Sequence, residues 1–151
     1  SGVVPEMVFG VAVGNALEGV SFSFDADLRA SYDITLWTLL NPFALLCGLV
    51  SLAMTVMHGA AYLALKAGDP VAARARGYGQ VAAIAAILLF ALAGILIATM
   101  VDGYRVTSEF VANAPSNPLA KTVVREPGAW LTNYGAHPWM LLAPALGVLP
   151  F

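Results

Sequence analysis

Long apolar runs alternate with short polar segments along this chain. The longest run, Asn41–Leu65, carries no formal charge when His58 is neutral, and a second run, Gln80–Val101, contains no acid or base. Each is as long as the roughly 20 residues with which an α-helix crosses a bilayer. A helix that is apolar on every face must be surrounded by protein or by lipid. The pattern therefore predicts two complete transmembrane helices.

Two further apolar segments flank these runs, at residues 3–20 and 139–151. The first is barely long enough to cross a bilayer and the second is too short. With the central spans placed at about 39–65 and 80–101, the sequence predicts an all-α, polytopic transmembrane helical bundle with about two complete spans and two partial ones. Residues 1–151 are expected to form a single transmembrane region and to be a fragment of a longer subunit.

The polar connections set the expected orientation. Ser21–Asp33 is acidic on balance, and Glu18 is expected to face water beside it. The segment after Leu65 is the most basic short loop, and we expect it to extend to Gln80. Because short basic loops remain in the cytoplasm, this loop should face inward and Ser21–Asp33 and Asp102–Asn133 outward.

The long polar segment Asp102–Asn133 contains one predicted helix and leads into a group of aromatic residues. Asn117 followed by Pro118 is typical of a helix start, so a short surface helix is expected to run through Lys121. Aromatic residues then mark a return to the membrane interface: Trp130, Tyr134 and Trp139. His137 precedes a proline and is expected to be a turn residue.

Composition supports lipid as the solvent and narrows the possible partners. Charged residues make up 11% of the chain, against about 25% in ordinary globular domains. The formal net charge is -2 and there is no basic stripe, so nucleic acid is not an expected partner. The lone cysteine, Cys47, excludes a disulfide within the chain and a metal site built on several thiolates. We expect Cys47 to be a small buried residue.

Ionisable residues inside predicted spans are the candidates for chemistry, because their burial is costly. They are Glu6 and His58. His58 follows Met54 by about one helical turn, and both side chains are of the kinds that bind haem iron. The alternative for His58 is a hydrogen bond to a neighbouring helix or to water. Glu6 could belong to a proton route or lie at the membrane boundary. No catalytic residue and no metal ligand is predicted.

Glycines are expected to allow close helix contact. Gly10 and Gly14 have the GxxxG spacing that lets two membrane helices approach closely. We expect such contacts around Gly10, Gly14, Gly48 and Gly59.

Four stretches resemble subunit II of the cytochrome bd quinol oxidases. The central one reads LLNPFALLCGLVSLAMTVMHGAAYLALK. GVAVGNALEGVSFSFDADLR is similar to the end of that subunit's fourth span and the following loop. DGYRVTSEF with SNPLAKTVVREPGAWLTN is similar to its sixth-to-seventh connection, and PALGVLP to the start of its seventh span. The resemblance covers essentially the whole chain, in order.

The resemblance implies an accessory subunit of a two-subunit terminal oxidase in the bacterial cytoplasmic membrane. This complex oxidises quinol and reduces dioxygen to water. Haem b and haem d are expected on the partner, subunit I, and a structural quinone and membrane lipid are further candidate ligands. The family's proton-route acids lie in early spans absent here, so neither Glu6 nor His58 inherits a role. Replacing Gly48 with leucine is expected to impair association with subunit I.

Two other classes remain open. Secondary transporters favour glycine- or proline-broken helices around a midplane site. Here the prolines cluster at helix ends, which argues against that class. A haem-carrying cytochrome b in its own right would depend on His58 and Met54.

Overall fold

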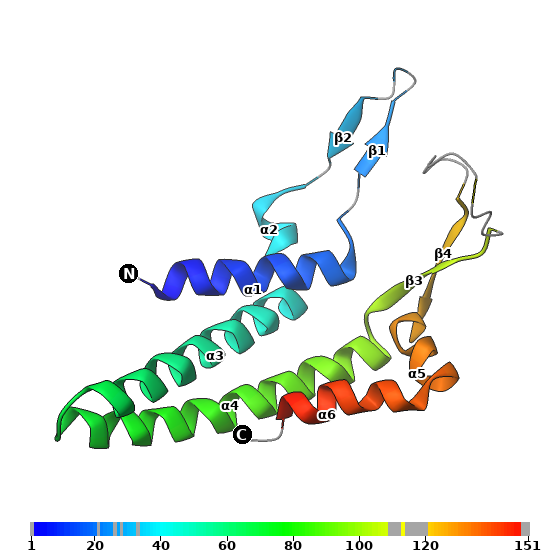
Figure 1. Cartoon of the computed structure of the whole chain (residues 1–151). Coiled ribbons are helices and arrows are strands. Elements are labelled where there is room, and N and C mark those ends of the chain that lie inside the picture. Colours follow the sequence, from blue (N-terminus) through cyan, green and yellow to red (C-terminus); the bar gives the residue numbers. More distant parts are fainter. Residues whose placement is uncertain are drawn as a thin grey trace. The chain divides into compact units, whose positions relative to one another are not determined.

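The computed structural model describes residues 2–20, 22–25, 27, 29–32, 34–108, 113 and 121–148 (Figure 1). The chain divides into two compact units, Ser1–Gly94 and Ile95–Phe151.

Three helices make up most of the first unit: α1 (Val3–Glu18), α3 (Pro42–Lys66) and α4 (Val71–Thr99), the last continuing into the second unit. Among the described residues, α3 and α4 are long and apolar enough to cross a membrane. Only 22% and 17% of their most apolar windows are buried, whereas the core helix of a soluble protein would be mostly covered. The fold is therefore the predicted polytopic transmembrane α-helical bundle.

Local sequence sets the start of α3. The Asn41 side-chain oxygen accepts a hydrogen bond from the backbone N–H of Ala44 at 2.6 Å, and Pro42 occupies the first turn. Asparagine at this position satisfies a backbone donor that the helix leaves open, and proline fits where no N–H is needed. A short helix, α2 (Leu36–Leu39), precedes it and is capped by Thr35.

The start of α4 corrects the expected basic loop. The helix begins at Val71 rather than near Gln80, so Arg74 and Arg76 lie in its first turns. The sequence from Val71 to Arg76 is rich in alanine and arginine, which are strong helix formers. The connection between α3 and α4 is thus only the tight turn around Gly68 and Pro70.

The connections at residues 21–33 and 102–133 contain β-hairpins that the sequence analysis missed. β1 (Phe22–Phe24) pairs antiparallel with β2 (Ala30–Tyr32). β3 (Asp102–Val106) pairs antiparallel with β4 (Val123–Pro127), with Asp102 opposite Pro127. β1 and β2 have only three residues each, and β3 and β4 carry charged residues without strict alternation, so none of the four shows the long alternating pattern that predicts a strand. The expected surface helix lies mainly outside the described residues, and Lys121, its last residue, is not helical.

The second unit continues from β4 into short helices. They are η2 (Ala129–Leu131), α5 (Thr132–Ala136), η3 (Pro138–Leu141) and α6 (Leu142–Val148). η2 packs directly on β3, because a Cβ atom added to Gly103 would lie 2.7 Å from the backbone nitrogen of Trp130. This contact joins the second hairpin to the helices that follow it.

Candidate functional site

The closest helix contact within the first unit joins α1 to α3 through glycines. A Cβ atom added to Gly10 would lie 2.6 Å from the Cα atom of Gly48, and one added to Gly14 would lie 2.6 Å from the Cα atom of Ala44. A Cβ atom on Gly48 would lie 3.0 Å from the backbone oxygen of Met7. The predicted close contacts at these three glycines are confirmed.

At Gly59 an added Cβ atom would meet nothing within 4 Å among the described residues, so no close contact forms there within this chain, and a contact with another part of the complex stays a prediction. The buried residue at this level of α3 is its neighbour, Ala60. Gly48 also has a partner that the sequence did not indicate, because it packs on α1 of its own chain. A leucine at Gly48 would therefore disturb the packing inside this chain before any contact with another subunit.

A polar cluster lies at one end of the α1–α3 contact. The Asn15 side-chain amide donates to the backbone oxygens of Val11 and Leu39, both at 2.8 Å. The Asn41 side-chain amide donates to Glu18 Oε2 and, at 3.4 Å, to Asn15 Oδ1. Asn41 thus caps α3 with its oxygen and ties α3 to α1 with its nitrogen.

Glu18 was expected to face water, and the structure corrects this. Its side chain is half-buried and accepts from Asn41. The sequence signal for this cluster was available: Asn15 and Glu18 are three residues apart and so share a helix face, and Asn41 opens the next long apolar run.

Glu6 occupies the opposite end of the same contact. The Thr55 hydroxyl of α3 donates to Glu6 Oε2 of α1 at 3.1 Å. Hydrogen bonds between side chains of neighbouring helices help to hold membrane helices together. The α1–α3 contact therefore has a carboxylate bonded across it at each end and glycines between.

His58 and Met54, the candidate haem ligands, lie on one side of α3. Both side chains are exposed on α3, and residues four apart on one helix project from the same side. The two axial ligands of a haem iron approach it from opposite faces of the ring, so this pair cannot hold one iron between them. Within the described ranges, no group of three or more His, Cys, Asp or Glu side chains is placed to hold a metal ion.

Cys47 is a partly buried free thiol on α3, not a fully buried one. Its backbone oxygen faces Gly10 in the α1–α3 contact. The residue thus belongs to the packing of the two helices.

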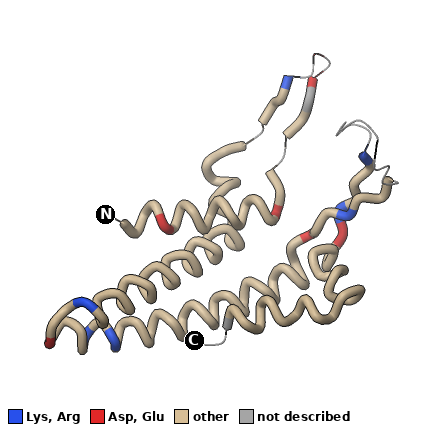
Figure 2. Tube along the Cα trace, viewed as in Figure 1, with Lys and Arg blue, Asp and Glu red and all other residues tan. Residues whose placement is uncertain are grey.

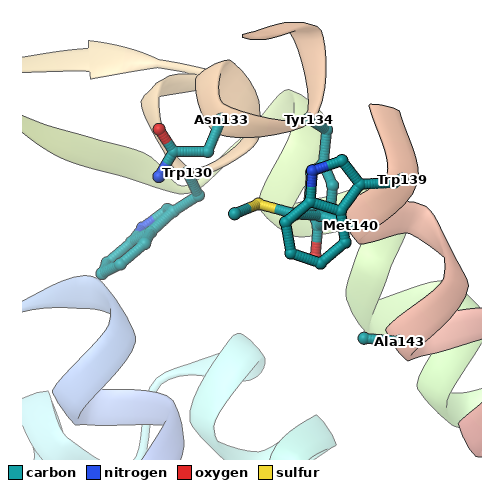
Figure 3. A pocket seen from close by; sticks show the side chains of 6 residues that line it. All are labelled: Trp130, Asn133, Tyr134, Trp139, Met140 and Ala143. Carbon is teal, nitrogen blue, oxygen red and sulfur yellow. The ribbon is translucent and has the colours of Figure 1, made fainter. Parts of the chain in front are cut away.

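Three aromatic residues of the second unit lie around an open cavity of about 320 Å³ (Figure 3). Trp130, Tyr134 and Trp139 line it with Asn133, Met140 and Ala143. His137 lies between α5 and η3, where its backbone N–H donates to the Asn133 oxygen at 2.7 Å and ends the helix. Tryptophan and tyrosine rings of this kind are typical of the membrane interface.

Basic side chains gather at the turn between α3 and α4 (Figure 2). Lys66 ends α3, and Arg74 and Arg76 lie in the first turns of α4. Arg76 lies 3.6 Å from Asp69, and both side chains are largely exposed. We call this the basic turn.

These features define the class of protein: a polytopic membrane protein built from long apolar helices, with charged residues largely at the helix ends. The chain belongs to the cytochrome bd terminal oxidase subunit II family, whose model matches residues 1–151. This confirms the resemblance noted in the sequence. Members of this family are membrane proteins and subunits of a haem-containing oxidase complex, so a partner subunit is implied.

Two relatives show how far the similarity extends. The chain is 47% identical over 146 residues to cytochrome bd-I ubiquinol oxidase subunit 2 of Escherichia coli (strain K12), covering 97% of this chain and 38% of that protein. It is 45% identical over 148 residues to a probable cytochrome oxidase subunit 2 of Haemophilus influenzae, covering 98% and 39%. The chain thus spans about two fifths of the length of the curated relatives it matches. Nothing in these similarities supports the transporter alternative.

Proposed function

We propose that this chain is the central part of the accessory subunit of a cytochrome bd-type quinol:dioxygen oxidoreductase in a bacterial inner membrane. Its role is to support assembly of the haem-bearing subunit I, where quinol is oxidised and dioxygen is reduced to water. The observation that carries this proposal is the 47% identity, along 97% of the chain, to a ubiquinol oxidase subunit 2.

The proposal divides the chemistry between two subunits. Haem b and haem d belong to subunit I, and a structural quinone is a further candidate ligand of the complex. No catalytic step is assigned to residues 1–151, which form one transmembrane region of a longer subunit with spans at about 3–20, 39–65, 80–101 and 139–151. Two observations support a packing role: the glycine contacts between α1 and α3, and the exposed apolar surface of α3 and α4.

The ionisable residues inside the spans, Glu6 and His58, are consistent with a packing role. Glu6 bonds to Thr55 across the α1–α3 contact, so we assign it to helix packing rather than to a proton route. His58 remains the weak candidate for a cofactor ligand. The one-sided placement of His58 and Met54 favours haem ligation by the partner subunit.

A reduced-minus-oxidised absorption spectrum tests the proposal. The full-length subunit is purified in mild detergent alone and together with subunit I, as wild type and as His58→Ala. Haem bands are expected only when subunit I is present, with equal intensity in both forms. His137→Ala is the matched control, because it changes the chain's other histidine. Haem bands on the isolated subunit that disappear in His58→Ala would make this chain a cytochrome in its own right and overturn the proposal.

A further inference from the structure

An apolar groove runs beside the basic turn between α3 and α4. Its volume is about 290 Å³. Alanines of both helices form most of its lining, together with Met57, Arg76, Gly79 and Gln80. All the residues that line the groove belong to the first unit, and Figure 1 shows the two helices joined at the turn.

Small side chains create this groove. The helices approach closely at one point, where a Cβ atom added to Gly79 would lie 3.1 Å from the Cβ atom of Ala60. Around that point, Ala61, Ala64 and Ala83 are too short to fill the space between the helices. From Ala64 to Met57 the groove follows roughly 10 Å of helix, at 1.5 Å per residue. An elongated apolar groove of this length suits part of an acyl chain.

The charge beside the groove is positive. Residues 66–76 have a formal charge of 3 − 1 = +2, from the three basic side chains of Lys66, Arg74 and Arg76 and the acidic side chain of Asp69. The Arg76–Asp69 pair is long and exposed, so it holds the guanidinium weakly. A guanidinium can make two parallel hydrogen bonds to a phosphate group. Arg76 can therefore reach a phosphate at the mouth of the groove.

We infer that the groove binds one anionic phospholipid. Its phosphate lies at Arg76, with Lys66 and Arg74 adding to the local positive charge, and one acyl chain lies between the alanines of α3 and α4. A lipid suits this groove better than a transmembrane helix does. A helix packed there would cover Arg76, and removing its charge from water is costly when its one ion pair, with Asp69, is long and exposed. A lipid phosphate supplies a stronger partner.

Native mass spectrometry of the full-length protein, with whatever subunit accompanies it, tests this inference. Phosphatidylglycerol is added, with phosphatidylcholine as the neutral control lipid. Arg76→Gln should reduce retention of phosphatidylglycerol about fivefold, a typical loss for one basic contact at a lipid surface. Arg74→Gln is the matched control, because it removes the same charge from a residue that does not line the groove. It should reduce retention less than Arg76→Gln does.

A second variant tests the acyl site. Ala83→Leu fills the groove and leaves every charge in place, so it should also reduce retention of phosphatidylglycerol. Glycerol 3-phosphate, which has a phosphate but no acyl chain, should not displace the lipid.

Four outcomes would overturn the site. The first is an equal loss of phosphatidylglycerol in Arg74→Gln and Arg76→Gln, and the second is equal retention of phosphatidylglycerol and phosphatidylcholine. The third is displacement of the bound lipid by glycerol 3-phosphate. The fourth is an Ala83→Leu protein that loses its partner subunit but still retains the lipid. The last would place a helix in the groove. Because the measurement counts bound lipid, it can fail while the haem spectra still support the proposed subunit role.

Discussion

Helix α3 meets its two neighbours in different ways. Against α1 it packs backbone to backbone through Gly10, Gly14 and Gly48, and polar side chains bond across both ends of the contact. Against α4 it makes a close approach at Ala60 and Gly79, with an open groove beside it. Between apolar helices in lipid there is little hydrophobic driving force, so association depends on close packing and interhelical hydrogen bonds. The α1–α3 contact has both close packing and interhelical hydrogen bonds, and we call it the fixed contact.

The largest expected effect comes from adding one methyl group at the centre of the fixed contact. Gly10→Ala places a Cβ atom 2.6 Å from the Cα atom of Gly48, and backbone cannot move aside as a side chain can. Overpacking of this kind costs typically about 1–3 kcal/mol, and we expect the upper end here. The measurement is the thermal unfolding midpoint of the purified complex in detergent.

Gly94→Ala is the matched control for that variant. It makes the same chemical change in α4, where an added Cβ atom meets no described residue within 4 Å. Alanine is the better helix former by about 1 kcal/mol, so this variant should be neutral or slightly more stable. Equal midpoints for the two variants would contradict the close α1–α3 contact.

The next largest effect is expected from removing the Asn41 side chain, which caps α3 and bonds to Glu18 of α1; we call this pair of bonds the Asn41 bridge. Asn41→Ala removes the cap of α3, worth about 1 kcal/mol, and one hydrogen-bond donor from Glu18. We expect a total loss of about 2 kcal/mol, since interhelical hydrogen bonds of membrane proteins contribute about 0.6 kcal/mol on average and about 1.7 kcal/mol at most. Unfolding in detergent again measures it.

Asn41→Asp separates the two parts of that loss. It keeps an oxygen that can cap α3 but replaces the amide donor beside Glu18 with an acceptor. At neutral pH it should therefore still be less stable than wild type. The deficit should shrink as the pH falls, because a protonated carboxyl can donate a hydrogen bond. A pH-independent deficit equal to that of Asn41→Ala would assign no stabilisation to the contact with Glu18.

The two contacts were not equally predictable from sequence. Transmembrane α3 could be predicted, because its apolar length and the Asn41–Pro42 start are both local signals. The GxxxG spacing of Gly10 and Gly14 identified the packing face of α1, and the structure confirms it. Gly59 shows the limit of this reasoning: spacing alone does not tell whether a glycine faces a neighbouring helix of the same chain, as Gly10 does, or another surface.

Features that depend on contacts between distant residues could not be predicted in the same way. The Asn41–Glu18 bridge joins residues 23 apart in sequence, and the Thr55–Glu6 bond joins residues 49 apart. The β3–β4 pairing brings together two short strands whose side chains show no strict alternation. The early start of α4 is different, because helix propensity in Val71–Arg76 did indicate it. Arg74 and Arg76 made the segment resemble a basic loop, although its residues favour a helix.

A smaller effect is expected at the other end of the fixed contact. Thr55→Ala removes the hydroxyl that donates to Glu6, and interhelical hydrogen bonds of membrane proteins average about 0.6 kcal/mol. Thr55→Ser is the matched control, because it keeps the hydroxyl and should restore most of the loss. If serine and alanine lower the unfolding midpoint equally, the bond to Glu6 contributes nothing and the fixed contact depends on its glycines and the Asn41 bridge.

The smallest effect is expected where α3 meets α4. Gly79→Ala adds a methyl group 3.1 Å from the Cβ atom of Ala60, which is tight but not a backbone collision. The gain in helix propensity, about 1 kcal/mol, should largely offset this crowding. The groove beside Gly79 gives the two helices room to shift by a few tenths of an ångström. The unfolding midpoint should therefore stay close to that of wild type, in contrast to Gly10→Ala. A loss at Gly79 as large as the loss at Gly10 would mean that α4 is held as rigidly as α1, and the groove would then have no freedom to adapt to a bound lipid.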